Sequence, residues 1–242
     1  ERNGAGAHTF AVIPRRIVTD MFLDCGINLY YEKAGEGAPL ILVHGNGEDH
    51  TVFDRLIPRL AELFTVYAVD SPGHGRSQRP GEFHYAGFAE TLSAFIGELG
   101  LERPFFCGFS DGGIIGLLLA SSQPALLSRM AVCGANLTPA GLKRGWRALF
   151  HAEFLLTRRP LLKMMLDEPQ IAEEALARIE IPTLVLAGGR DLVRESETRA
   201  IAEGIHGAAL QILPGETHGS YVIHSDKLFP LLRDFFLPGG AR

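Results

Sequence analysis

The sequence has no hydrophobic run that could cross a membrane and no long run of charge of one sign, and it contains only three cysteines. A membrane-spanning helix needs roughly 18 or more consecutive apolar residues, and no segment approaches that length. The formal net charge of -5 is spread along the chain, which argues against a nucleic-acid partner. We therefore expect no nucleic-acid partner and no membrane partner, and a small-molecule substrate is favoured.

The few cysteines limit the redox and metal chemistry of the chain. Cys25, Cys107 and Cys133 are odd in number, and the last two lie inside predicted core strands. This pattern predicts buried free thiols in a reducing, cytoplasmic setting and not a disulfide framework. No pair of cysteines or histidines has the close spacing of a zinc site, so we expect no metal.

What is present is enough apolar sequence for one well-filled domain. The chain has 242 residues, of which 46% are hydrophobic and 21% are charged, and this composition is typical of a globular protein. We predict a single domain over residues 15–237, preceded by a loose leader over residues 1–14. The sequence leaves the oligomeric state open.

The order of strand and helix patterns predicts the fold class. Residues 17–23 and 27–33 alternate apolar and polar positions around a turn, which predicts an antiparallel hairpin. Residues 40–43 are a continuous apolar run, typical of a strand covered on both faces. Strands and helices then alternate, which predicts an α/β fold with a mostly parallel, doubly wound sheet. The expected helices cover residues 51–63, 85–99, 111–122, 195–205 and 227–237, and the further strands cover residues 65–70, 104–109, 129–134, 182–187 and 208–213.

One stretch interrupts this alternation. Residues 137–179 contain no strand pattern but carry apolar side chains at helical spacing with basic residues between them. We predict a short helical lid inserted between two sheet strands, with Trp146, Phe150 and Phe154 lining the pocket. Two alternatives remain: the aromatic residues serve only the packing of the lid itself, or the segment is a helix pair that merely packs on the domain.

The segment Gly108-Phe109-Ser110-Asp111-Gly112 lies at the corner between an apolar strand and a small-residue helix. So sharp a turn strains the backbone at the serine and leaves room only for small neighbours. It also lifts the hydroxyl clear of the sheet at a helix N-terminus, where negative charge is favoured. The pattern G-x-S-x-G is that of a nucleophile elbow, so Ser110 is the candidate nucleophile. The alternative is a plain helix N-cap.

A serine hydroxyl needs a base to activate it, and the base needs a group that orients it. His218 follows the last predicted strand and Asp191 follows the strand before it, so both lie at carboxyl ends of strands, where such sheets bind their ligands. These two residues are the candidate base and acid. Other candidates are interpreted as structural: His44, His74 and Asp70 in tight loops, and the remaining histidines, including His50, on predicted helices or surface turns.

Together these residues resemble the α/β-hydrolase fold superfamily over about residues 17–237. The matching features are the His44-Gly45 corner, the loop over residues 70–77, the elbow over residues 108–112, Asp191 and His218. The resemblance implies that Ser110 is the nucleophile, His218 the general acid and base, and Asp191 the orienting acid, in the chain order of that superfamily. It also implies an oxyanion hole made by the backbone N–H groups of Asn46 and Asp111.

Departures from the superfamily narrow the expected chemistry. The serine at the elbow differs from members that hydrolyse epoxides or haloalkanes through a carboxylate. The loop from His44 to Glu48 lacks the longer glycine run of many carbon–carbon bond hydrolases. The Ser-Asp-Gly-Gly sequence of residues 110–113 is similar to members related to valacyclovir hydrolase, which cleave amino-acid esters. By that similarity Asp111 would hold a substrate ammonium; the alternative is that it only favours the helix N-terminus.

We therefore predict a serine hydrolase that cleaves a small carboxylic ester through an acyl-enzyme on Ser110, with no metal and no organic cofactor. Thioesterase, lactonase, acyltransferase and cofactor-free perhydrolase activities use the same triad and remain alternatives. A ligand-binding or receptor protein with little turnover is the alternative from a different class.

Overall fold

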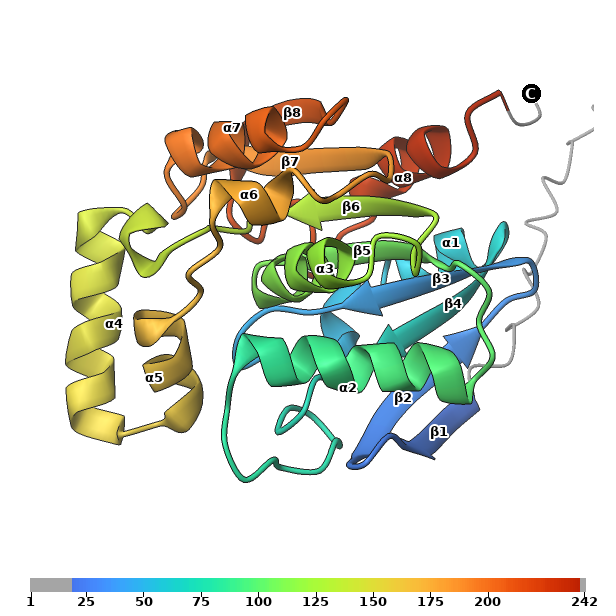
Figure 1. The fold of residues 1–242 in the computed structure, drawn as a ribbon, viewed down its shortest axis with the longest axis horizontal. Helices are drawn as coiled ribbons and strands as arrows, with labels where there is room; N and C mark the ends of the chain where they lie inside the picture. The colour runs from blue at the N-terminus through green and yellow to red at the C-terminus, as the bar shows by residue number, and fades with distance from the viewer. Residues whose placement is uncertain (1–18, 240–242) are drawn as a thin grey trace, which may run out of the picture.

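A computed structural model describes residues 19–239 of the chain. Its centre is one sheet of eight strands in the order β1-β2-β4-β3-β5-β6-β7-β8 (Figure 1). The β1–β2 and β2–β4 pairs are antiparallel, and all the other neighbours are parallel. The predicted mostly parallel sheet with an antiparallel N-terminal hairpin is therefore confirmed. The predicted leader and the domain start at residue 15 lie outside the described residues.

The elements follow the predicted order closely. The strands are β1 (Thr19–Asp24), β2 (Asn28–Ala34), β3 (Ala38–Val43), β4 (Phe64–Val69), β5 (Phe105–Phe109), β6 (Arg129–Cys133), β7 (Thr183–Arg190) and β8 (Ala209–Thr217). The α-helices are α1 (Ile57–Leu60), α2 (Tyr85–Glu98), α3 (Asp111–Ser122), α4 (Arg144–Thr157), α5 (Pro160–Asp167), α6 (Glu173–Leu176), α7 (Glu195–Gly204) and α8 (Leu228–Phe236), and two 3-10 turns are η1 (His50–Phe53) and η2 (Pro139–Gly141). Within residues 19–239, no helix combines the length and apolar character needed to span a bilayer.

The core has two layers, one on each face of the sheet. In β3, Ile41 and Val43 pack in one hydrophobic cluster with residues of α2, α3, α6 and α7. Leu40 and Leu42 pack in the other cluster with residues of α1 and α8. Successive side chains of a strand point to opposite faces, so a strand covered on both sides must be apolar at every position. This explains the continuous apolar run from which the parallel sheet was predicted.

The predicted helix over residues 51–63 is wrong. The chain forms instead the 3-10 turn η1 and the short helix α1, separated by a turn. Pro58 lies in the first turn of α1, where its missing N–H costs nothing. A longer helix arriving from residue 51 would need that N–H for its hydrogen-bond ladder and would clash with the proline ring, so it must break before this point.

The chain between β6 and β7 forms a helical insert. Helices α4 and α5 stand together at one edge of the molecule, beyond the carboxyl ends of the strands (Figure 1). Helix α6 packs differently, because Leu176 and Ile179 belong to the same core cluster as residues of α3. The insert therefore projects from the domain only over α4 and α5. The domain and lid boundaries given by the sequence remain predictions.

Candidate active site

The elbow between β5 and α3 is a strained turn. Ser110 has φ 53° and ψ -114°, a backbone conformation that is unfavourable for a residue with a side chain. A Cβ atom on Gly108 would collide with the carbonyl oxygen of Gly112, and one on Gly112 would collide with the carbonyl oxygen of Val43. Glycine is required at both positions. The turn aims the Ser110 side chain into a cavity at the edge of the sheet.

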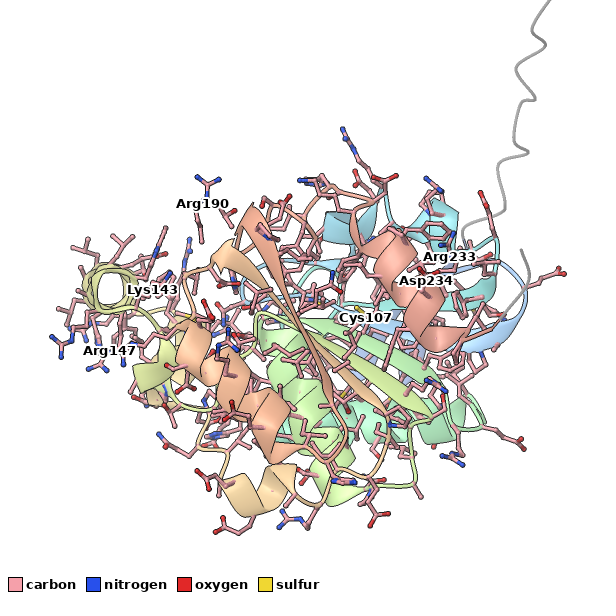
Figure 2. All side chains as sticks on the ribbon, turned by 90° about the horizontal axis from the view of Figure 1, so that it is seen from above. Cys107, Lys143, Arg147, Arg190, Arg233 and Asp234 are labelled. Carbon is pink, nitrogen blue, oxygen red and sulfur yellow. The ribbon has the colours of Figure 1, made fainter. Side chains whose placement is uncertain are left out.

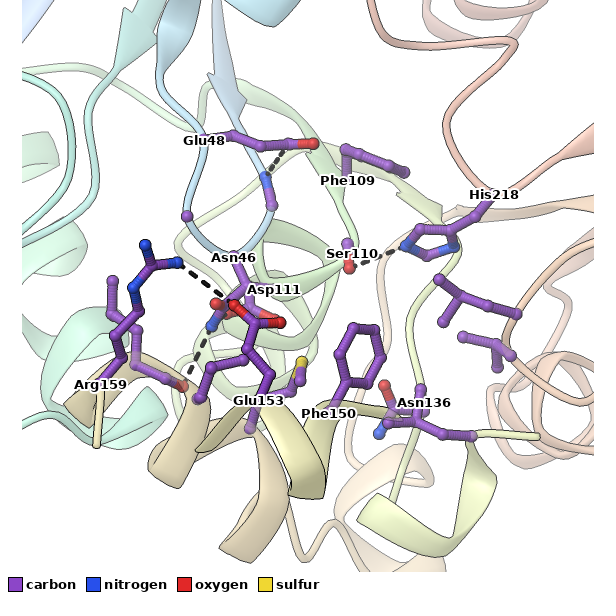
Figure 3. A pocket seen from close by; sticks show the side chains of 18 residues that line it. Asn46, Glu48, Phe109, Ser110, Asp111, Asn136, Phe150, Glu153, Arg159 and His218 are labelled. Carbon is purple, nitrogen blue, oxygen red and sulfur yellow. Dashed lines mark hydrogen bonds and ion pairs between the residues drawn. The ribbon is translucent and has the colours of Figure 1, made fainter. Parts of the chain in front are cut away.

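The structure brings three of the predicted site residues together. The Ser110 hydroxyl lies 3.0 Å from Nε2 of His218 (Figure 3). Nδ1 of His218 lies 2.7 Å from Oδ1 of Asp191. The three residues follow β5, β8 and β7, whose carboxyl ends meet at this edge of the sheet. A serine, an imidazole and a carboxylate in this order form a hydrogen-bonded relay.

The charge of Asp191 fixes the direction of this relay. Burial raises the pKa of Asp191, but the hydrogen bond from His218 and the N–H groups of Val193 and Gly188 outweigh it and hold that pKa below its ordinary value. The carboxylate can therefore only accept a hydrogen bond, so Nδ1 of His218 is the donor. This leaves the lone pair of Nε2 facing the Ser110 hydroxyl.

The two predicted oxyanion-hole residues both line the cavity beside Ser110. Within residues 19–239, the backbone N–H groups of Asn46 and Asp111 donate to no protein acceptor. The loop that carries Asn46 is shaped by Glu48, whose carboxylate accepts the N–H of Gly45 at 2.9 Å. Two free N–H groups next to a nucleophile can bind a developing negative charge, so the oxyanion-hole prediction stands as a prediction.

The side chains of these residues form a network that the sequence did not predict. The amide of Asn46 donates to Oδ2 of Asp111 at 2.8 Å and to the carbonyl oxygen of Leu161 at 3.2 Å. The Tyr85 hydroxyl donates to the other Asp111 oxygen at 2.8 Å. Burial raises the pKa of Asp111 although both hydrogen bonds lower it. The network joins the elbow, the loop after β3, α2 and α5, and no pattern in the sequence indicated Tyr85.

The cavity has a volume of about 560 Å³. The insert contributes most of its apolar walls together with one pair of charged side chains, and the loops near the elbow contribute polar side chains; the lining includes Leu142, Phe150, Leu161, Leu162, Met165, Val193, Asn46, Glu48, Asp111, Asn136, Glu153 and Arg159. Glu153 and Arg159 form an ion pair at 3.3 Å at one side of it (Figure 3). Glu48, Glu153 and Arg159 were not predicted, because charged residues of loops and helices carry no signal of which way they face.

The structure places one of the three predicted pocket aromatics at the cavity. Phe150 lines the cavity, whereas Trp146 and Phe154 do not. Trp146 is 46% exposed, and Phe154 lies under the guanidinium of Arg158. One helix presents a narrow stripe to a neighbour, so residues a full turn apart need not reach the same cavity. The sequence pattern gave the periodicity of α4 but not the angle at which it meets the domain.

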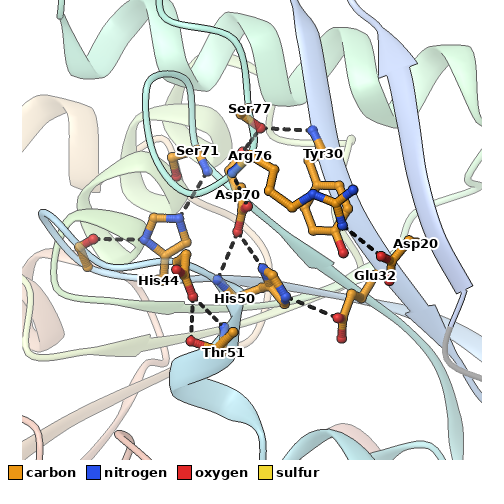
Figure 4. Close-up of polar contacts among 12 residues, drawn as sticks. Asp20, Tyr30, Glu32, His44, His50, Thr51, Asp70, Ser71, Arg76 and Ser77 are labelled. Carbon is orange, nitrogen blue, oxygen red and sulfur yellow. Dashed lines mark hydrogen bonds and ion pairs between the residues drawn. The ribbon is translucent and has the colours of Figure 1, made fainter.

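The other histidines near the strand ends are structural (Figure 4). His44 Nδ1 donates to the carbonyl oxygen of Gly45, and its Nε2 accepts the N–H of Ser71 at 3.0 Å. Burial lowers the pKa of His44 to about 4, so the ring is neutral. The structural role predicted for His44 is confirmed, because its two hydrogen bonds join the loop after β3 to the loop after β4. His74 is also buried, and burial lowers its pKa.

His50, which was expected on a helix or a surface turn, begins the 3-10 turn η1 but is buried and not at the surface. The ring is buried between two carboxylates, with Nδ1 2.7 Å from Asp70 and Nε2 3.0 Å from Glu32 (Figure 4). Asp70 also accepts the backbone N–H groups of His50 and Arg76. Among the described residues, Asp49, His50 and Asp70 are the group whose donors are close enough for a metal ion. Protein partners already occupy both ring nitrogens and both Asp70 oxygens, so this cluster ties β2, β4 and η1 together.

Comparison with known proteins places this arrangement in a family. The model of the alpha/beta hydrolase family matches residues 40–230, which include the elbow, Asp191 and His218. The chain belongs to the alpha/beta hydrolase family. Human serine hydrolase BPHL is similar to this hydrolase, with 27% identity over 87% of this chain and 83% of its own length.

Solved structures of other alpha/beta hydrolases superpose on this one. Carboxylesterase CesB of Bacillus subtilis matches with a TM-score of 0.79 at 17% identity, covering 93% of each chain. The meta-cleavage product hydrolase CumD of Pseudomonas fluorescens matches with a TM-score of 0.77 at 20% identity, covering 92% of this chain and 99% of its own. At these identities the likeness shows the fold that this alpha/beta hydrolase shares with them and does not select a substrate.

Proposed function

We propose that this alpha/beta hydrolase is a serine hydrolase that cleaves a small carboxylic ester through an acyl-enzyme on Ser110. The observation that carries the proposal is the relay from Ser110 through His218 to Asp191, which opens into a cavity of about 560 Å³. A cavity of this size accommodates a small ligand.

The reaction would proceed in two acyl transfers. His218 Nε2 takes the proton of Ser110 as the hydroxyl oxygen attacks the ester carbonyl, and the negative charge on the carbonyl oxygen is held by the N–H groups of Asn46 and Asp111. His218 then returns this proton to the leaving alkoxide, which departs as the alcohol. Water enters, gives a proton to His218 and attacks the acyl group, and the acid leaves as Ser110 recovers its proton. No metal or organic cofactor takes part in this scheme.

Helices α4 and α5 would act as the lid over this reaction, within the predicted range of residues 137–179. Phe150 and Leu161 give the cavity an apolar wall that suits the hydrocarbon part of an ester. The depth to which water enters beside this wall would decide between hydrolysis and acyl transfer. Thioesterase, lactonase and perhydrolase activities use the same groups and differ only in the acyl donor or acceptor.

A panel of p-nitrophenyl esters, acyl thioesters and lactones tests the proposed function. We expect the short-chain esters to give the highest kcat/KM and a fluorophosphonate probe to label Ser110, because the relay makes that hydroxyl nucleophilic. Mass spectrometry of the labelled peptide identifies the residue. Labelling of Ser110 without turnover of any substrate would favour the ligand-binding alternative. An unlabelled Ser110 would contradict both the serine hydrolase proposal and this alternative.

A second candidate, cleavage of esters with an α-amino group, is supported by the charge of the cavity. Asp111 and Glu48 both line it, and within residues 19–239 neither forms an ion pair with a lysine or arginine. Burial raises the pKa of both carboxyl groups. A substrate ammonium would compensate a buried carboxylate that otherwise lacks a cation.

We therefore expect alanine benzyl ester to be cleaved with a kcat/KM about ten-fold or more above that of benzyl propionate, since a hydrogen bond to a charged group contributes about 1.5–3 kcal/mol. Asp111→Asn should bring the ratio of the two close to one. Tyr85→Phe is the matched control, because it removes one donor to Asp111 but keeps the carboxylate. Equal kcat/KM values for the two esters in the unmodified enzyme would eliminate this preference.

A further inference from the structure

Helix α4 presents an apolar face to solvent. None of its residues is buried, and its main contacts are with α5 and η2 (Figure 1). Seven large hydrophobic side chains are exposed among the described residues, and four of them lie on this helix: Trp146, Leu149, Leu155 and Leu156, with exposed fractions of 46%, 55%, 62% and 85%. Exposed apolar residues scattered singly need no explanation, but four on one helix mark a contact surface.

Three of these four side chains, Leu149, Leu155 and Leu156, form a strip along the helix. Leu149 and Leu156 are seven residues apart and so lie on the same side of the helix, with Ala152 between them. Leu155 lies one turn beyond Ala152 on the adjoining side. We call Leu149, Ala152, Leu155 and Leu156 the outer strip. Phe150 lies on the side of the helix turned away from this strip and lines the cavity, and Glu153, which also lines the cavity, lies between Phe150 and Leu149.

The same helix is strongly basic. Residues 143–159 contain five basic residues, Lys143, Arg144, Arg147, Arg158 and Arg159, and one acidic residue, Glu153, in a chain whose formal net charge is -5. Glu153 is already paired with Arg159.

Part of this charge has no counterpart in the protein. Arg144, Arg147, His151 and Arg194 line one shallow hollow beside the outer strip. Within residues 19–239, none of these four side chains forms an ion pair. Figure 2 shows Arg147 extending away from the body of the molecule, where α4 is seen end-on. Unpaired arginines therefore line a hollow next to the outer strip, and Arg147 extends outward.

We propose that α4 is an interfacial helix that docks this protein on the surface of a bilayer containing anionic phospholipid. An apolar strip flanked by arginines suits a lipid surface, since the leucines enter the boundary between headgroups and acyl chains while the arginines meet lipid phosphates. A free phosphate or a nucleic acid would leave the leucines exposed. A second copy packed on the same face would bring two sets of arginines together without acids to neutralise them.

This inference goes beyond the proposed function and does not depend on it. It also replaces the expectation of no membrane partner, which rested only on the absence of a spanning run and says nothing of a helix lying flat on the surface. Docking through the outer strip would hold the cavity close to the bilayer, one helix diameter (~10 Å) from the lipid, on the other side of α4. An ester that partitions into the bilayer would then reach the cavity at a raised local concentration.

The single tryptophan of the chain, Trp146, makes the test direct because it lies on α4. The full chain is titrated with phosphatidylglycerol vesicles and, separately, with phosphatidylcholine vesicles. We expect a blue shift of Trp146 emission and quenching by brominated acyl chains with the anionic vesicles only. Binding should weaken steeply between low and high salt, because screening reduces the attraction of the arginines.

Variants separate the two parts of the surface. Arg144→Gln with Arg147→Gln should lower the partition coefficient about 25-fold, from about five-fold for each arginine near an anionic surface. Leu149→Ser with Leu155→Ser and Leu156→Ser should lower it by at least about ten-fold. Phe22→Ser is the matched control, because Phe22 on β1 is 55% exposed, as is Leu149. It should bind as the unmodified chain does.

Ser110→Ala should bind the vesicles unchanged, so failure of docking and failure of the proposed catalysis are distinguishable. Three results would overturn the proposal: no change of Trp146 emission with anionic vesicles, equal binding to both kinds of vesicle, or binding that the leucine and arginine variants leave unaltered. A dimer in solution that the leucine variant dissociates, without vesicle binding, would assign the outer strip to a second copy instead.

Discussion

Ser110→Ala should lower kcat on p-nitrophenyl acetate by on the order of 10⁴ or more, because the acyl-enzyme cannot form without the hydroxyl. The residual rate would come from the N–H groups at the oxyanion position, which the substitution leaves in place. KM should change little, since the cavity walls that hold the substrate are untouched. His218→Ala should have a similar effect, because a relay that acts as a unit fails when either member is removed.

The control for this substitution is Ser122→Ala at the far end of the same helix. Its hydroxyl bonds only to carbonyl oxygens of the preceding turn, at 2.8 Å to Leu118 and 3.1 Å to Leu119. It should retain full turnover. Thermal unfolding of both variants checks that they are folded. Wild-type turnover by a folded Ser110→Ala protein would remove the acyl-enzyme and with it the proposed mechanism.

Asp191→Asn should lower kcat by about 10³ to 10⁴ with little change in KM. The carboxylate accepts hydrogen bonds from Val193 N–H and from His218 at the same oxygen, and from Gly188 N–H at the other. An amide nitrogen facing His218 would donate a hydrogen bond to Nδ1, so the ring proton would lie on Nε2. A protonated Nε2 cannot take the proton of Ser110, and the base is lost although the ring stays in place.

Glu216→Gln is the matched control for the acid. Glu216 lies two residues before His218 and is a partly buried carboxylate at the surface, paired with Lys227 at 2.6 Å and accepting a hydrogen bond from the Ser220 hydroxyl at 2.6 Å. Its loss removes a neighbouring charge without touching the relay, so kcat should stay within about two-fold of the unmodified enzyme, as expected for a surface pair. Steady-state kinetics measures kcat of both variants, and thermal unfolding checks that they are folded. An Asp191→Asn protein that keeps the unmodified rate would show that the orientation of His218 does not depend on this carboxylate.

Much of the fold was predictable because buried parallel strands leave a strong pattern. A strand with helices on both faces, such as β3, has to be apolar at every position. The elbow was predictable for a similar reason: the close approach of Gly108 to Gly112 excludes any side chain, so the glycines are visible in the sequence.

Other features depend on angles and partners that no local pattern records. The ring of His50 is held by Glu32 on β2 and Asp70 after β4, two segments that pair only in the folded sheet. Trp146 and Phe150 lie one helical turn apart, so the sequence pattern does not distinguish them. The angle at which α4 packs on the domain leaves Trp146 exposed to solvent and turns Phe150 into the cavity.

The sequence by itself determined the sheet, the strained serine turn and the positions of Asp191 and His218 along the chain, because each is dictated by steric or solvation demands within a few residues. Only the tertiary structure decided which carboxylates share the cavity, that Asn46 and Tyr85 both bind Asp111, and that one side of α4 carries leucines and unpaired arginines into solvent. The physical reason is that burial and pairing are properties of surfaces meeting in space, and residues far apart in the chain supply the two sides.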